Sequence, residues 1–152
     1  MIHNKNIPQE IKKLPLKAKL ELLYGDGFWR VRGIKELDLK PFDVSDGPHG
    51  LRKQVAKGDQ LGIMASLPAT CFPTASLVAC SFDENLIFEM GQAIAKEALH
   101  QKVAVVLGPG VNIKRNPLCG RNFEYFSEDP LLSGKMGASF IKGVQSLGVG
   151  TS

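Results

Sequence analysis

Three segments of the chain carry apolar residues at the spacing of an amphipathic helix. Leucines recur through residues 16–23, where a proline suits the first turn and a glycine can close the last. The tetrapeptide SFDE at 81–84 fits a capping box, in which the serine caps a helix and the glutamate reaches back, and an apolar stripe continues to about residue 99. An aspartate-proline pair begins a third helix over 129–147, before a glycine. These patterns predict three helices that each bury one face.

Short apolar runs between these helices predict strands. The run at 41–44 ends in an SDGP turn, and the run at 69–72 ends at a proline. Residues 103–107 do not alternate with polar ones, which is typical of a strand buried on both faces. Residues 148–152 look like the opening of one more strand. Because helices and strands alternate, we predict an α/β protein with a parallel sheet and helical crossovers.

The composition is that of an ordinary globular protein. Hydrophobic residues make up 43% of the 152 residues and charged residues 22%, which is not the composition of a disordered chain. The net charge is only +4, and the lysines near the N-terminus fit a solvated helix face. Because basic and aromatic residues do not interleave, no nucleic-acid partner is expected.

Hydropathy and cysteine content narrow the class of protein further. Nowhere do about 18 uncharged apolar residues follow one another, so the sequence predicts neither a membrane span nor a secretory signal, and no membrane partner. Cys71, Cys80 and Cys119 are an odd set without metal-ligand spacing, which favours reduced thiols in a cytoplasmic protein. Cys80 lies in an apolar stretch and is expected in the core. No metal or organic cofactor is expected.

The first group of residues suited to chemistry is SDGPHGLR at 45–52, directly after a predicted strand. Asp46 offers a bidentate acceptor and Arg52 a planar donor fork. Adjacent sugar hydroxyls need that combination, because each hydroxyl donates to a carboxylate and accepts from a guanidinium. An ordinary Asp-Gly-Pro turn explains the same residues equally well, so both interpretations stay open. His49 is assigned a place in the loop or at its rim.

The second group lies at 114–129, after the strand predicted at 103–107. Arg115 and Arg121 are candidates to point into a cleft, and Glu124 is a candidate to orient one of them. A role for Glu124 as general acid or base is the alternative, although single carboxylates are more often ion-pair partners. Both groups follow predicted strands, which is how a parallel α/β protein builds a site.

Four sequence blocks, in their order and spacing, resemble those of a known family. The blocks are SDGPHGLR, ATCFPTA at 69–75, GPGVNIKRNPLCGRNFEYFSEDP at 108–130 and GVGTS at 148–152. Over roughly residues 16–152 they resemble the N-terminal barrel domain of glycoside hydrolase family 3, and its bacterial β-glucosidases in particular. The resemblance implies the N-terminal part of a (β/α)8 TIM-type barrel, about half of it, with the sugar pocket at the C-terminal ends of the strands.

The resemblance also implies roles for four residues. Asp46 would hold hydroxyls of the terminal glucose, Arg52 would act at its hydroxymethyl side, and Arg121 would bind its ring hydroxyls. Glu124 would stand beside Arg121 as its partner. In the family pattern the nucleophilic aspartate and the acid/base glutamate come later than Ser152, so no catalytic residue is nominated here. The implied partner is a β-glucoside or a related small saccharide.

The leading hypothesis is that residues 1–152 form the N-terminal part of the catalytic barrel domain of a β-glucosidase-like retaining glycoside hydrolase, which cleaves terminal β-D-glucosyl residues. The alternative is a non-catalytic remnant or one half of a split enzyme, acting as a weak sugar-binding or interaction module. A closed barrel takes about 250 residues. This chain alone is therefore expected to be inactive, and to associate with itself or with a complementary C-terminal fragment.

Overall fold

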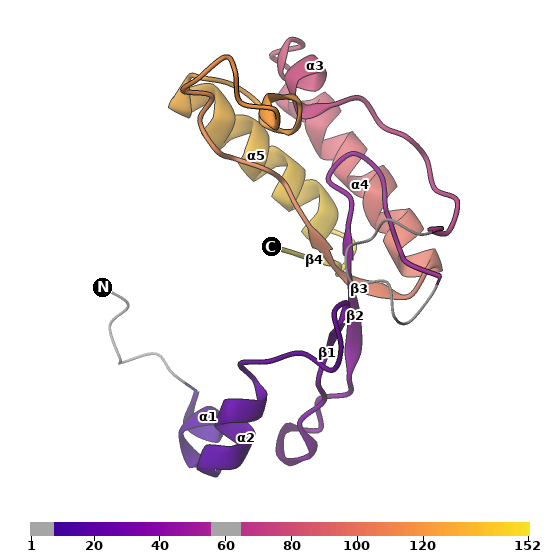
Figure 1. The fold of residues 1–152 in the computed structure, drawn as a ribbon, viewed down its shortest axis with the longest axis vertical. Helices are drawn as coiled ribbons and strands as arrows, with labels where there is room; N and C mark the ends of the chain where they lie inside the picture. Colours follow the sequence, from indigo (N-terminus) through magenta and orange to yellow (C-terminus); the bar gives the residue numbers. More distant parts are fainter. Residues whose placement is uncertain (1–7, 56–64) are drawn as a thin grey trace. The chain divides into compact units, whose positions relative to one another are not determined.

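The computed structural model describes residues 8–55 and 65–152, and its elements are drawn in Figure 1. The chain divides into two compact units, residues 1–43 and residues 44–152. Within the described ranges, none of the helices is both long and apolar enough to cross a bilayer.

The first unit is built on two short helices and a strand pair. Its elements are α1 (Gln9–Lys13), α2 (Leu16–Glu21), β1 (Arg30–Val31), the 3-10 turn η2 (Lys35–Leu37) and the first residues of β2 (Phe42–Asp46). Strand β1 pairs antiparallel with β2, and Arg30 forms an ion pair with Asp43 across that pairing at 3.0 Å. A small core of Leu14, Ala18 and Ile34 holds the unit together. The helix predicted over 16–23 is confirmed as α2, which ends two residues earlier.

The second unit combines two long helices with a parallel strand pair. Its elements are the end of β2, α3 (Ala75–Ala79), α4 (Glu84–His100), β3 (Val103–Leu107), the 3-10 turn η3 (Asn122–Glu124), α5 (Pro130–Gln145) and β4 (Gly150–Thr151). Helices α4 and α5 lie side by side (Figure 1). Strand β3 pairs in parallel with β4, and α5 is the crossover between them. The predicted α/β alternation is therefore confirmed for this unit.

The strands form one sheet in the order β1-β2-β3-β4. Strands β1 and β4 stand at its two edges, so the sheet formed by the described residues is open rather than closed. Strands β2 and β3 are neighbours in that sheet. The loops that leave these two strands contain both groups of residues singled out in the sequence.

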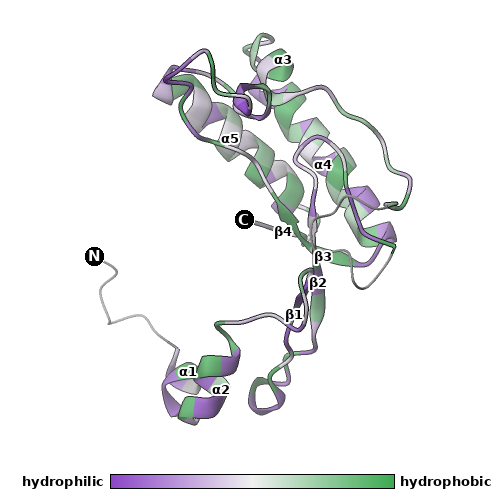
Figure 2. Cartoon of the chain, in the orientation of Figure 1, coloured by the Kyte–Doolittle hydropathy of each residue, from purple (hydrophilic) through white to green (hydrophobic). Residues whose placement is uncertain are grey.

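The contact between α4 and α5 forms the centre of the second unit's core. Ile94 of α4 and Phe140 of α5 are among its fully buried side chains. The helices approach closely at Gly143, where a Cβ atom would lie 2.2 Å from the carbonyl oxygen of Phe88. A side chain at that position would therefore push the two helices apart. Figure 2 shows that both helices carry hydrophobic and hydrophilic residues, as expected of helices with one buried face.

Strand β3 has the predicted bounds but not the predicted burial. All its residues are apolar (Figure 2), and Val103 and Val106 are buried. Ala104 is exposed, so the described part of the chain covers one face of β3 only in part. The expectation of a strand buried on both faces is wrong in that respect.

The capping residues of the long helices differ from those predicted. Asp83, not Ser81, caps α4, because its carboxylate accepts hydrogen bonds from the amides of Asn85 at 2.9 Å and Leu86 at 3.2 Å. The Ser81 hydroxyl instead accepts from the Asp83 amide at 3.2 Å. A carboxylate directly before the first turn satisfies two free amides, and its charge suits the positive end of the helix. Asp129 caps α5 as predicted, accepting from the amide two residues on.

The strand predicted at 69–72 is not formed. The amide and hydroxyl of Thr70 donate to the carboxylate of Glu97 in α4, and the amide of Phe72 donates to the carbonyl oxygen of His49 at 2.8 Å. These hydrogen bonds connect the segment to a side chain and a loop instead of a neighbouring strand. The short helix α3 follows it, and Cys80 at the end of α3 is exposed rather than part of the core.

Candidate functional site

Asp46 ends β2 and opens a tight loop that runs to Arg52. The hydroxyl of the buried Ser45 donates to the Asp46 carbonyl oxygen at 2.9 Å, and the Arg52 amide donates to the same oxygen at 2.8 Å. Gly50 has a φ of +132°, and a Cβ there would lie 2.1 Å from the carbonyl oxygen of Thr70, so this turn requires glycine. The side chains of Asp46 and Arg52 are both exposed at the ends of this loop.

A second, longer loop over 108–129 connects β3 to α5. Its two arms lie against each other, because Gly110 and Tyr125 form a parallel bridge and the Lys114 amide donates to the Ser127 carbonyl oxygen at 3.3 Å. The returning arm contains η3. Backbone contacts between its two arms therefore order the loop, and η3 forms part of this ordered segment.

Arg121 and Glu124 form an ion pair across η3, through the guanidinium Nε and the carboxylate Oε1. The Arg121 side chain is 73% exposed, whereas that of Glu124 is 15% exposed. The hydrogen bond that Arg121 donates to Glu124, together with the charge of that carboxylate, raises the pKa of Arg121, and the charges of Tyr125 and Asp46 act in the same direction. Exposed ion pairs contribute little to stability. The ion pair therefore matters for orientation, because Glu124 holds one edge of a guanidinium whose side chain is otherwise largely exposed.

His49 belongs to the first loop, and its ring lies near the second. Its ring centroid is 6.4 Å from that of Phe123 in η3. Burial lowers the pKa of His49, and the carboxylates of Glu124 and Asp46 act against that shift. Neither ring nitrogen has a hydrogen-bond partner among the residues that the structure describes. The sequence pattern places His49 in the loop or at its rim, and it gives no indication of the contact with η3. Its position three residues after Asp46 was the feature of the sequence that could have indicated a place in the site.

The structure brings three of the four predicted site residues together. Glu124 contacts Arg121 directly, and the Asp46 carboxylate acts to raise the pKa of both His49 and Arg121. The fourth, Arg52, is connected to Asp46 through its backbone amide and not through its guanidinium. The Arg121–Glu124 pair places a carboxylate and a guanidinium side by side, which is the combination that neighbouring hydroxyl groups require.

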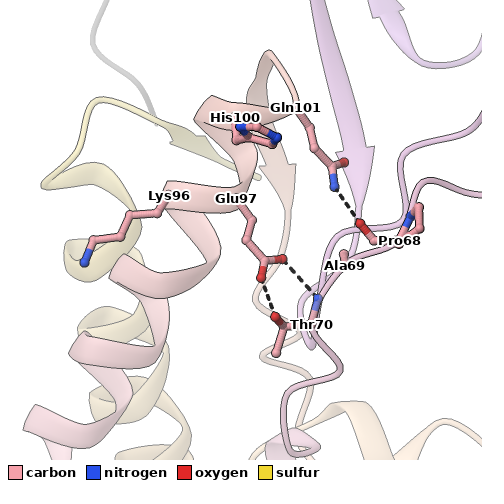
Figure 3. A pocket seen from close by; sticks show the side chains of 7 residues that line it. All are labelled: Pro68, Ala69, Thr70, Lys96, Glu97, His100 and Gln101. Carbon is pink, nitrogen blue, oxygen red and sulfur yellow. Dashed lines mark hydrogen bonds between the residues drawn. The ribbon is translucent and has the colours of Figure 1, made fainter.

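A cavity of about 530 Å³ lies at the C-terminal end of α4 and not at this cluster. Figure 3 shows the Glu97 carboxylate accepting from both the amide and the hydroxyl of Thr70, and the Gln101 side-chain amide donating to the Pro68 carbonyl oxygen. Glu97 is thus engaged in fastening residues 68–70 to α4. We assign this region a structural role.

Within residues 8–55 and 65–152, no three His, Cys, Asp or Glu side chains are grouped so that they could hold a metal ion. All three cysteines are free thiols on the surface.

The fold and the cluster define an α/β protein with a polar site in the loops that follow two neighbouring strands. Its sequence matches the profile of the glycosyl hydrolase family 3 N-terminal domain over residues 34–152. The chain belongs to glycosyl hydrolase family 3.

Two relatives illustrate the range within this family. Over 145 residues the chain is 50% identical to the thermostable β-glucosidase B of Acetivibrio thermocellus, which covers 95% of the chain and 19% of the relative. Over 143 residues it is 48% identical to an exo-α-(1→6)-L-arabinopyranosidase of Bifidobacterium longum, and this match covers 93% of the chain and 19% of the relative. The chain therefore spans about a fifth of the length of these relatives.

Solved structures confirm the fold class. The family 3 β-glucosidase of Bifidobacterium adolescentis superposes with a TM-score of 0.81 at 46% identity, covering 93% of this chain and 19% of that one. The β-glucosidase 3B of Thermotoga neapolitana, solved in complex with glucose, gives a TM-score of 0.80 at 37% identity, covering 94% and 22%. The open α/β sheet of this chain is the N-terminal part of a TIM-type barrel.

Proposed function

We propose that this chain forms one wall of the glucose pocket of a β-glucosidase-like retaining glycoside hydrolase that acts on terminal β-D-glucosyl residues. The observation that carries the proposal is that the loop begun by Asp46 and the loop that holds the Arg121–Glu124 pair leave neighbouring strands, and that His49 of the first loop lies 6.4 Å from Phe123 of the second, between ring centroids. The similarity to proteins named β-glucosidases, one of them solved with glucose, supports the same substrate class.

Each proposed role follows from the chemistry of the side chain. Asp46 accepts hydrogen bonds from neighbouring sugar hydroxyls, because an ionised carboxylate is purely an acceptor. Arg121 donates to ring hydroxyls while Glu124 keeps its guanidinium turned in one direction. Arg52 acts at the hydroxymethyl side of the sugar. These groups bind and orient the substrate, and none of them is proposed as a reacting group.

Retaining hydrolysis needs two carboxyl groups about 5 to 5.5 Å apart, one as nucleophile and one as proton donor. Glu124 is a poor candidate for either role because its carboxylate already holds Arg121. In this proposal, parts of the protein other than residues 1–152 supply both reacting carboxyl groups, since the relatives are about five times as long.

The proposal is tested by assaying the protein as its gene encodes it, and the 152-residue chain alone, with an aryl β-D-glucoside. We expect turnover with the former and none with the latter. Glucose binding without turnover in both preparations would favour the alternative of a non-catalytic sugar-binding module. If the protein as its gene encodes it showed neither glucose binding nor turnover, the proposal would be refuted.

A second substrate class is favoured by one specific observation, the 48% identity to an arabinopyranosidase. L-Arabinopyranose lacks the hydroxymethyl group of glucose, so the proposed role of Arg52 separates the two substrates. If the pocket is built for glucose, R52A should lower kcat/KM for an aryl glucoside more than for an aryl α-L-arabinopyranoside. An equal loss on both substrates would remove Arg52 from the hydroxymethyl side.

We further propose that residues 1–152 expressed alone associate with themselves or with a complementary C-terminal part of the protein. The second unit exposes more than half of each of several large apolar side chains: Leu77, Phe82, Leu118, Phe123 and Leu131. Large exposed apolar surface generally marks a contact with another surface. Sedimentation velocity of the 152-residue chain should show association. A stable monomer with cooperative unfolding would refute this.

A further inference from the structure

The hydroxyl of Ser76 is a junction between three segments of the second unit. Ser76 lies in α3, and its Oγ accepts a hydrogen bond from the Lys114 ammonium at 2.7 Å. The same oxygen lies 3.0 Å from the carbonyl oxygen of Asn122, 3.3 Å from that of Phe123 and 3.4 Å from that of Tyr125. A hydroxyl has one proton to donate. It therefore accepts from Lys114 and donates mainly to Asn122, the nearest carbonyl.

These carbonyl groups belong to η3 and the residue after it, which is the segment that carries Arg121 and Glu124. The turn has only three residues and no side-chain cap at its start. So short a 3-10 turn is not stable by itself. Contacts from outside must determine its position, and Ser76 supplies one on the side of α3.

Lys114 strengthens this junction and extends it to the other arm of the loop. Its ammonium makes the bond to Ser76 a charge-assisted one, which is stronger than a bond between neutral groups. Both side chains are partly buried, so water competes less for these groups. The Lys114 amide also donates to the Ser127 carbonyl oxygen beyond η3. Ser76 and Lys114 thus connect α3, the outgoing arm and the returning arm.

We infer that Ser76 and Lys114 are positioning residues for the sugar-binding pair Arg121–Glu124. The inference rests on the function proposed above. With its side chain 73% exposed, Arg121 depends for its direction on Glu124 and on the backbone of η3. If η3 is free to move, each encounter with sugar must first order it, and that entropic cost weakens binding. The pair acts on the sugar through the backbone and does not touch it.

The test uses the protein as its gene encodes it, with glucose affinity and the KM and kcat for an aryl β-D-glucoside as readouts. S76A and K114M should each weaken glucose binding and raise KM about tenfold, the effect of losing one partly buried hydrogen bond. S76T keeps the hydroxyl and should restore most of the affinity. K142M, which removes an exposed lysine from the last turn of α5, should behave as the unaltered protein. Because both residues act through one junction, S76A/K114M should be little worse than either single variant.

Three outcomes would overturn the inference. S76A and K114M could match K142M in glucose affinity while R121A is impaired, which leaves the proposed function intact. S76T could fail to recover the affinity lost in S76A although both variants keep the melting temperature of the unaltered protein. The double variant could show the full product of the single effects, which would indicate two unrelated contacts. An R121A variant with unchanged glucose affinity would instead refute the assignment of Arg121, on which the inference depends.

Discussion

The α4–α5 helix pair and the loop over 108–129 belong to the same unit but are held together differently. The helices depend on buried apolar side chains and a close backbone approach at Gly143. The loop has few buried side chains and depends on hydrogen bonds such as those of Ser76 and on the Arg121–Glu124 ion pair. The difference teaches that stability and the proposed sugar binding should be separable in this unit. A change in the helices should alter unfolding, and a change in the loop should alter binding.

The largest effect is expected where the two helices touch. G143A should destabilise the protein by about 3 kcal/mol, because its Cβ would meet the Phe88 carbonyl at 2.2 Å and the backbone must move. G134A in the same helix has nothing within 4 Å of the added Cβ and should stabilise by about 0.5 kcal/mol through helix propensity. Thermal unfolding followed by circular dichroism measures both. Equal effects would mean that helix contact does not dominate stability here.

The loop side of the comparison is tested with its two arginines. R121A should weaken glucose binding by roughly tenfold or more, since it removes a charged donor that Glu124 holds in place. R115A removes an exposed arginine from the same loop and should change affinity little. Both variants should keep the melting temperature of the unaltered protein. If R121A lowered the melting temperature as well as the glucose affinity, the loop and the helical core would not be separable.

The cap of α4 gives a smaller effect on the helix side. D83A should cost about 1 kcal/mol, because it leaves the amides of Asn85 and Leu86 without their acceptor. S81A should lower the free energy of unfolding by about half as much, since the Ser81 hydroxyl accepts from one amide, that of Asp83, which lies before the first turn of the helix. Urea denaturation of the two variants ranks them. The reverse order would restore the capping box that the sequence suggested.

The same comparison explains what could be predicted from the sequence. The elements α5 and β3 were predicted because their signals are local: a cap followed by proline, and a continuous apolar run. The segment at 69–72 was misassigned because its hydrogen-bond acceptor, Glu97, lies 27 residues away. Residue type and position after a strand were enough to nominate Asp46, Arg52, Arg121 and Glu124. The junction of Ser76 and Lys114 joins residues 38 apart, and no local pattern reveals it.

The smallest effect concerns His49 of the first loop, whose ring lies near Phe123 of the second loop. Burial lowers the pKa of His49, while the carboxylates of Glu124 and Asp46 act against that shift. Below about pH 6.5 the imidazole of His49 therefore binds a proton more readily in the unfolded chain than in the folded protein. The folded state is favoured above that pH, and this contribution to stability is lost as the pH falls. The urea midpoint should therefore drop between about pH 7.5 and pH 5.5 less steeply in H49Q than in the unaltered protein. H100Q, which removes the exposed His100, serves as the matched control and should keep the original slope. A steeper drop in H49Q would mean that the two carboxylates outweigh burial, and that the gap between the loops is open to water.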